Sequence, residues 1–150
     1  MIIDGVKITE RGLARHFICA DRCKFRRNTL LEYKDKKWII STVGAMPQSE
    51  ITKKYPEFCS KNGFETIGFN RYYETMAFEA EPVKNKDGIT IYYDADVEKQ
   101  IYFDSDLAIS DCNFETDKQA NEMHDKVVEE LIKKIKGDNR LWLLTQLNMY

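Results

Sequence analysis

The first two-thirds of the chain consist of short runs in which apolar and polar residues alternate or β-branched and aromatic residues gather. Runs of this length and composition predict β-strands. The expected strands cover residues 6–9, 16–20, 25–33, 38–43, 69–80, 89–94 and 100–104, with 107–109 as a further candidate. The short polar segment 34–37 predicts a hairpin between two of them. Asn85-Lys86-Asp87-Gly88 predicts a turn, because Asp-Gly suits positive φ angles.

Between residues 45 and 67 the alternation stops, and Pro47, Pro56 and Gly63 occur among lysines and other polar residues. A connection of this length is unusual in a compact domain. We therefore expect a loop insertion here, which is either a functional flap or specific to a family.

The pattern changes to a helical period near the end of the chain. Apolar residues recur at steps of three and four: Ala120, Met123, Val127, Val128, Leu131, Ile132 and Ile135. Thr116 with Gln119 three residues later is typical of a capping box, so we expect a long amphipathic helix over 117–136. Asp138 suggests the cap of a second, short helix over 138–147.

Strands followed by terminal helices predict an α+β fold, in which an antiparallel sheet packs against the C-terminal amphipathic helix. A length of 150 residues with 43% hydrophobic residues fits a single domain, 1–150. The aromatic strands and the last helix carry more apolar surface than one helix covers, which favours self-association.

Charge and targeting signals narrow the class of protein. The chain has 23 basic and 25 acidic residues and a net charge of -2, which argues against a DNA- or RNA-binding protein. The N-terminus lacks the pattern of a signal peptide, and no apolar run reaches the length of a membrane span. We expect a soluble, intracellular protein.

The four cysteines favour reduced thiols in such a compartment. Zinc is the alternative, with Cys19 and Cys23 as half of a site. The other ligands would come from residues that form no second close pair: Cys59, Cys112, His16 and His124. We therefore expect no metal.

Polar residues cluster inside the expected strand 25–33. Alternation places Arg26 and Asn28 on one face and Phe25, Arg27 and Thr29 on the other. An arginine beside an amide can bind a phosphate together with a ribose or base edge. The alternative is that one arginine faces solvent and the other pairs with an acid such as Glu32 or Glu74.

Arg71, Tyr72 and Tyr73 repeat this chemistry, because a tyrosine can stack on a base while an arginine binds phosphate. Alternatively, the tyrosines belong to the core, since strands are rich in tyrosine.

Met123 and His124 lie near the start of the expected helix. His124 is either a core-edge residue with satisfied hydrogen bonds or a ligand contact near the positive end of the helix dipole. His16 has the same two interpretations.

The chain shows no known catalytic motif. Several aspartates flank the expected strands, but their spacing does not match a calcium-binding loop: Asp94, Asp96, Asp104, Asp106 and Asp111. A nucleophile elbow, a glycine-rich phosphate loop and a His-Glu-x-x-His helix are all missing from the sequence. We expect neither an enzyme nor a cofactor.

Seven strings together are similar to one family. They are Ile8-Thr9-Glu10-Arg11-Gly12, His16-Phe17-Ile18-Cys19-Ala20, Cys23-Lys24-Phe25-Arg26-Arg27-Asn28-Thr29-Leu30, Ser41-Thr42-Val43-Gly44, Arg71-Tyr72-Tyr73-Glu74-Thr75-Met76-Ala77-Phe78, Tyr102-Phe103-Asp104-Ser105 and Ala120-Asn121-Glu122-Met123-His124. Through them the chain resembles the Thoeris anti-defence sponges of phages and prophages. The resemblance runs from residue 6 to about 135 and excludes the 45–67 insertion.

The resemblance implies a protein of the host cytoplasm that sequesters cyclic ADP-ribose isomers without cleaving them. Such isomers are made by bacterial TIR-domain sensors, and their removal keeps the downstream effector inactive. The family forms homodimers or larger homo-oligomers, and some members hold other cyclic nucleotides. Leu13-Ala14-Arg15, the 45–67 insertion and the tail around Trp142 depart from the family. Ligand preference and assembly therefore stay open.

By the same resemblance, the candidate ligand-binding residues take distinct roles. Phosphate would be bound by Arg26, Arg27 and Arg71, and a ribose or base edge by Asn28. Phe25, Tyr72 and Tyr73 would stack on the base. Met123 and His124 would line the pocket. Alternation prevents Arg26 and Arg27 from facing one pocket within a regular strand. Two other functions remain open: an enzyme that hydrolyses a cyclic nucleotide, and a phage protein that inhibits a host protein by direct binding.

Overall fold

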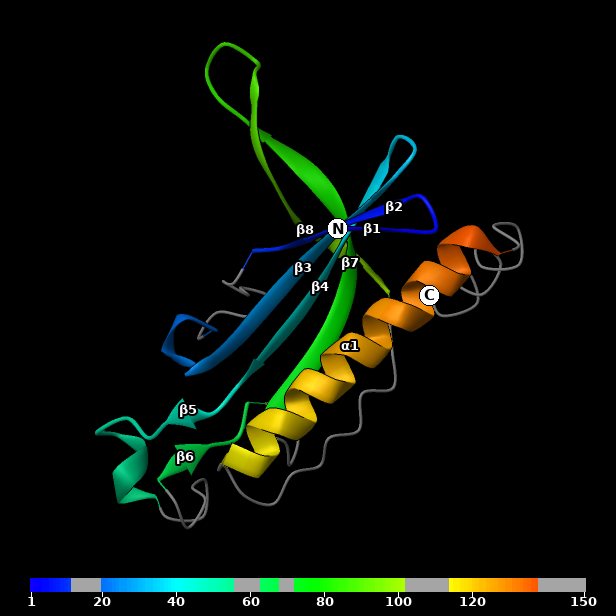
Figure 1. Cartoon of the computed structure of the whole chain (residues 1–150). Coiled ribbons are helices and arrows are strands. Elements are labelled where there is room, and N and C mark those ends of the chain that lie inside the picture. Colours follow the sequence, from blue (N-terminus) through cyan, green and yellow to red (C-terminus); the bar gives the residue numbers. More distant parts are fainter. Residues whose placement is uncertain (12–19, 56–62, 68–71, 102–113, 138–150) are drawn as a thin grey trace.

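The structure of the chain is a computed structural model, which describes residues 1–11, 20–55, 63–67, 72–101 and 114–137. These ranges form a six-stranded antiparallel sheet in the order β1-β2-β3-β4-β7-β8 and one long helix, α1 (Figure 1). The predicted α+β class is therefore confirmed.

The elements have the following bounds. The large sheet contains β1 Ile2–Ile3, β2 Val6–Glu10, β3 Phe25–Tyr33, β4 Lys36–Gly44, β7 Tyr73–Lys84 and β8 Thr90–Ile101. A second, two-stranded sheet contains β5 Met46–Pro47 and β6 Phe64–Glu65, and the helical elements are η1 Ala20–Arg22, η2 Thr52–Lys54 and α1 Phe114–Lys136.

Both predicted turns are confirmed. Tyr33 pairs with Lys36 across the β3–β4 turn, and Lys34 has the positive φ of 55° that a tight hairpin requires. In the β7–β8 turn, the Asn85 side-chain oxygen accepts hydrogen bonds from the N–H groups of Asp87 and Ile89. Gly88 has a φ of 77° there.

Several predicted boundaries are wrong. The predicted strands 89–94 and 100–104 share one strand, β8, up to Ile101, because the strand absorbs a register shift opposite Phe78 and Ala80 instead of ending. For its part, β7 continues to Lys84, past the predicted end at residue 80. Ala20 lies in a 3₁₀ turn rather than a strand. Residues 69–71, 102–104, 107–109 and 138–147 lie outside the described part of the chain.

The segment 45–67 is not a plain loop. Met46 pairs with Glu65 and Pro47 with Phe64, so both ends of the segment join in the small sheet β5–β6. Residues 56–62 lie outside the described ranges.

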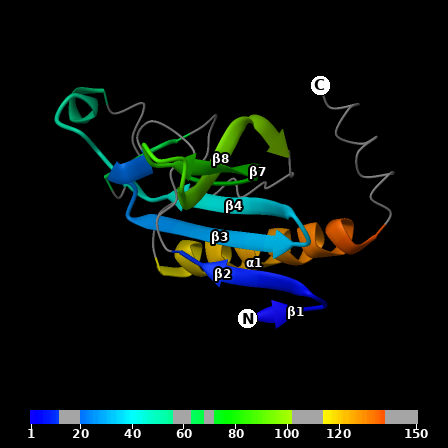
Figure 2. The same cartoon turned by 90° about the horizontal axis from the view of Figure 1, so that it is seen from above.

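The helix α1 packs its predicted apolar stripe against one face of β3, β4 and β7 (Figure 2). The resulting core contains Val6, Leu31, Trp38, Ile40, Ala77, Val127, Val128, Leu131, Ile132 and Ile135. The predicted capping role of Thr116 is wrong, because the helix already includes Phe114. The Thr116 hydroxyl instead lies 3.0 Å from the hydroxyl of Tyr73 and links the helix to β7.

The opposite face of the sheet is also covered. Leu30, Ile39 and Phe78 are buried there, and β8 lies on this side of β4 (Figure 2). The ammonium of Lys37 lies 4.7 Å from the ring centroid of Tyr93, which ties β4 to β8.

No helix in the described ranges is long and apolar enough to cross a bilayer.

Candidate functional site

Three residues proposed for stacking meet at one end of the sheet. Phe25 begins β3 and Tyr73 begins β7, and both are paired with Gly44 on the strand between them. The rings of Phe25 and Tyr73 make an edge-to-face contact with centroids 5.7 Å apart. Half-buried Tyr72 packs against the same cluster, as does Phe64 from β6. We call these four side chains the aromatic cluster.

Gly44 is necessary for this packing. A Cβ atom at position 44 would overlap with Cγ and Cδ1 of Tyr73 and with the carbonyl oxygen of Tyr72. The missing side chain lets the Tyr73 ring lie across the strand, an arrangement that aromatic residues often adopt opposite a strand glycine. Tyr73 is buried, and its hydroxyl donates a 2.5 Å hydrogen bond to Asp117. Tyr73 therefore fixes the helix, while Phe25, Tyr72 and Phe64 are only half-buried.

Sequence reasoning missed Phe64. A single aromatic residue in a segment without alternation carries no periodic signal. Only the pairing of β5 with β6 brings it to the cluster.

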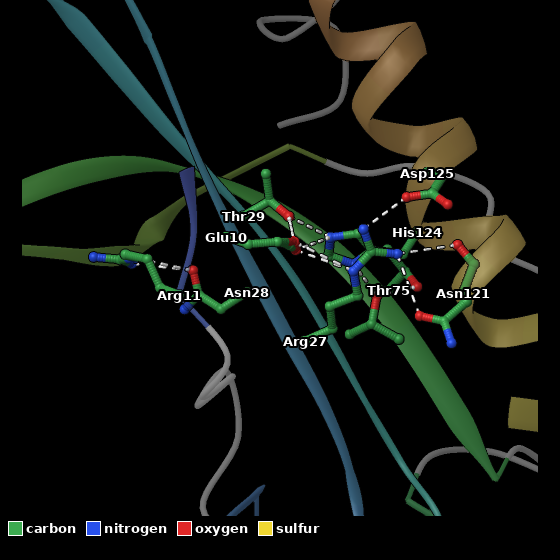
Figure 3. Close-up of polar contacts among 10 residues, drawn as sticks. Glu10, Arg11, Arg27, Asn28, Thr29, Thr75, Asn121, His124 and Asp125 are labelled. Carbon is green, nitrogen blue, oxygen red and sulfur yellow. Dashed lines mark hydrogen bonds and ion pairs between the residues drawn. The ribbon is translucent and has the colours of Figure 1, made fainter. Parts of the chain in front are cut away.

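Arg27 faces the helix, as the alternation of β3 requires. Its Nε lies 3.0 Å from Glu10, its Nη2 lies 2.7 Å from Asp125, and its Nη1 is 3.3 Å from both oxygens of Asn121 (Figure 3). Burial lowers the pKa of Arg27, but hydrogen bonds and charges of Asp125 and Glu10 outweigh it, so the net pKa is raised. Arg27 thus joins β2, β3 and α1. Glu32 and Glu74, the acids considered from the sequence, are not its partners. Contacts with residues of β2 and α1, far away in the sequence, decide the pairing.

Arg26 and Asn28 point to the other face of the sheet, with Val43 and Ser41 as their cross-strand neighbours. Arg11 donates two hydrogen bonds to the side-chain oxygen of Asn28, from Nε at 3.3 Å and Nη2 at 3.1 Å (Figure 3). Because that oxygen is an acceptor for both, the orientation of the Asn28 amide is determined.

Arg11 also donates from Nη1 to the carbonyl oxygen of Tyr93 at 2.6 Å, and so ties β8 to this face. Burial lowers the pKa of Arg11, and the charge of Asp94 opposes that shift. Sequence reasoning did not single out Arg11, because a lone arginine at the end of a strand has no distinguishing pattern.

His124 is completely buried between the helix and the sheet. Its Nε2 lies 2.7 Å from the hydroxyl of Thr29 (Figure 3). Its Nδ1 lies 2.7 Å from the hydroxyl of Thr42. The Thr42 hydroxyl is in turn 2.8 Å from that of Thr75. We call this set, with Glu10, the histidine network.

The direction of every hydrogen bond in the histidine network follows from the carboxylate of Glu10. A carboxylate only accepts, so the Thr29 hydroxyl donates to Glu10, at 2.6 Å to one of its oxygens. Thr29 has no second proton, so His124 Nε2 carries the proton that is donated to Thr29. Nδ1 is then bare and accepts from Thr42, whose oxygen accepts from Thr75.

Burial, followed by the charge of Arg27, lowers the pKa of His124 to about 4, against opposing effects of Glu10 and Asp125. The ring is therefore neutral at pH 7. His124 lies nearly three turns after Phe114, and Met123 packs against the core. Both residues act in the helix–sheet contact, away from the helix N-terminus.

The remaining candidates lie outside the described residues, namely His16 and Arg71. In the part of the chain that the structure describes, no group of three or more His, Cys, Asp or Glu side chains is placed to hold a metal ion. Cys23 is buried, whereas Cys19, Cys59 and Cys112 fall outside, so the expected state of the thiols stays a prediction.

Comparisons with protein-family models, with curated proteins and with solved structures find no match for this chain.

Proposed function

We propose that this protein binds a cyclic ADP-ribose isomer of the kind made by TIR-domain sensors and sequesters it without cleaving it. It would act in the host cytoplasm as a phage or prophage anti-defence protein and assemble as a homo-oligomer. The resemblance of the seven strings to the Thoeris anti-defence sponges supports this proposal.

One observation carries the proposal further than the strings do. Phe25 and Tyr72 come from strings almost 50 residues apart in the sequence, and both belong to the aromatic cluster. Arg26 and Asn28 lie at the same end of β3 as Phe25 and point to the opposite face of the sheet. The half-buried rings match the adenine face of such a ligand. A guanidinium and an amide on the other face of the same strand match its pyrophosphate and ribose hydroxyls.

The geometry also separates the two arginines. Two carboxylates surround Arg27, and a phosphate there would replace at least one of them and meet the charge of the other. We therefore assign the phosphate contact to Arg26, with Arg71 and His16 as further contacts, and a donor role to the amide of Asn28. His124, Met123 and Arg27 hold the helix in place.

Isothermal titration calorimetry with a panel of cyclic ADP-ribose isomers tests the proposal, with the ligand recovered by heating and identified by mass spectrometry. We expect binding and an unchanged ligand. Losing a charge-assisted hydrogen bond costs about 1.5–3 kcal/mol, so Arg26→Met should weaken binding roughly 10- to 100-fold. The matched variant Arg27→Met should lower the melting temperature and leave the affinity within about threefold.

Three results would contradict the proposal. If the panel gives no binding, the ligand class is wrong. Recovery of a cleaved product would indicate a hydrolase. Equal affinity of Arg26→Met and the parent protein would remove the assigned phosphate contact.

A further inference from the structure

The 45–67 segment is held firmly against the body of the protein. Glu65 is buried, with 8% of its surface exposed, and its carboxylate lies 2.6 Å from Nη2 of Arg22. The backbone N–H of Ser49 donates to the same oxygen at 3.0 Å. A buried carboxylate is tolerated only with partners of this kind, so they fix β6 against η1.

The anchoring sets the position of Phe64. Consecutive residues of a strand point to opposite sides, so Phe64 points away from the Glu65–Arg22 pair and packs into the aromatic cluster. Pro47 is its partner on β5, and the next residue, Gln48, donates its N–H to Gly63 at 2.9 Å. The half-buried ring is thus held from both ends of a short strand.

A basic side chain lies over this ring. The ammonium of Lys24 is 5.8 Å from the ring centroid of Phe64. The backbone of Lys24 is fixed by a 3.0 Å hydrogen bond from its N–H to the carbonyl of Ala45, while its side chain is exposed. A cation–π contact at an exposed site contributes only about 0.5–1 kcal/mol, which leaves the ammonium able to move to a stronger anionic partner.

We infer that Phe64 and Lys24 form part of the ligand site, with Phe64 stacking on the nucleobase and Lys24 binding a phosphate of the same ligand. This inference rests on the proposed function and adds to it, because it makes the 45–67 segment a determinant of specificity. Phe64 then gives the base one more aromatic ring to stack on, which family members that lack the 45–67 segment do not offer.

The test compares Phe64→Leu with Phe64→Tyr, again by titration with the cyclic ADP-ribose isomer that the parent binds. Stacking of a base on an aromatic ring is worth about 1–3 kcal/mol, so Phe64→Leu should bind at least fivefold more weakly. Leucine preserves apolar packing, and a purely structural role would therefore leave the affinity unchanged. Phe64→Tyr keeps the aromatic face and should restore the affinity to within about threefold of the parent.

The segment supplies a matched control. Tyr55 is another aromatic residue of the same segment, and Tyr55→Leu should leave the affinity unchanged. Lys24→Gln should weaken binding about threefold or more, whereas Lys54→Gln, at an exposed lysine of the same segment, should not.

The outcomes separate the two proposals. Parent binding with equal affinity for Phe64→Leu and Lys24→Gln overturns this inference and leaves the proposed function intact. Absence of binding by the parent overturns both. If Phe64→Leu unfolds, the Lys24→Gln affinity decides, because that change leaves the apolar packing intact.

Discussion

The Nε2 atom of His124 on α1 lies 2.7 Å from the hydroxyl oxygen of Thr29 on β3, buried in the helix–sheet contact. These residues are 95 positions apart in the sequence. Their contact fixes where the helix lies along the strand, because a buried imidazole must satisfy both ring nitrogens.

The first prediction concerns the tautomer of His124. Because Thr29 donates to Glu10, we expect the proton on Nε2 and a bare Nδ1 at pH 7. Nitrogen chemical shifts of labelled imidazole in NMR spectra distinguish the two forms. A proton on Nδ1 would mean that the hydrogen bonds of the histidine network run in the opposite direction.

The second prediction concerns pH. The pKa of His124 is about 4 in the folded protein and about 6.5 when unfolded, so the unfolded chain binds the proton more strongly. The contribution of His124 to the free energy of unfolding is fully present above pH 6.5 and is lost as the pH falls to about 4. The difference between the two pKa values corresponds to up to about 3 kcal/mol of unfolding free energy.

Urea unfolding of the parent and of His124→Gln between pH 8 and pH 4 measures this contribution. His124→Gln removes this titrating group, so the difference in unfolding free energy between the two proteins reports its contribution. We expect the parent to be more stable at pH 8 and its advantage to shrink toward pH 4. A pH-independent difference would contradict the buried, neutral histidine.

The third prediction concerns Thr42. Thr42→Val keeps the shape of the side chain and removes the hydroxyl that donates to His124. An unsatisfied buried acceptor costs about 1–3 kcal/mol, so the free energy of unfolding should fall by that amount. Thr90→Val, at an exposed position of β8, is the control and should change it by less than about 0.5 kcal/mol. Equal effects of the two changes would show that the histidine network adds no stability.

The fourth prediction concerns Gly44. Gly44→Ala places a methyl group in the space of the Tyr73 ring and should destabilise the protein by about 2 kcal/mol or more. Thermal or urea unfolding measures the loss. Gly137→Ala, at the end of α1, is the control and should change stability by less than about 1 kcal/mol. A neutral Gly44→Ala would mean that Tyr73 does not lie across β4.

The fifth prediction concerns the anchoring of the 45–67 segment. Glu65→Gln removes the charge that Arg22 pairs with, so β5 and β6 should open more often. Trypsin should then cleave faster at the exposed Lys53 and Lys54. Glu81→Gln, at an exposed carboxylate of β7 outside this segment, should cleave at the parent rate. Unchanged cleavage of Glu65→Gln would show that other contacts hold the segment.

The sequence by itself determined the class of fold and most of its elements. The stripe from Ala120 to Ile135 predicted the helix and its buried face, because burial on one side imposes the helical period. The segments 25–33 and 38–43 predicted a hairpin, and strand alternation separated Arg26 from Arg27. These are local patterns, and local geometry alone produces them.

Only the tertiary structure decided which of those side chains meet. Arg27 pairs with Glu10 and Asp125. His124 forms hydrogen bonds with Thr29 and Thr42. The position at which α1 packs on β3 and β4 determines these contacts. Phe64 reaches the aromatic cluster through the pairing of β5 with β6. Such contacts join residues far apart in the chain, and no periodicity records them.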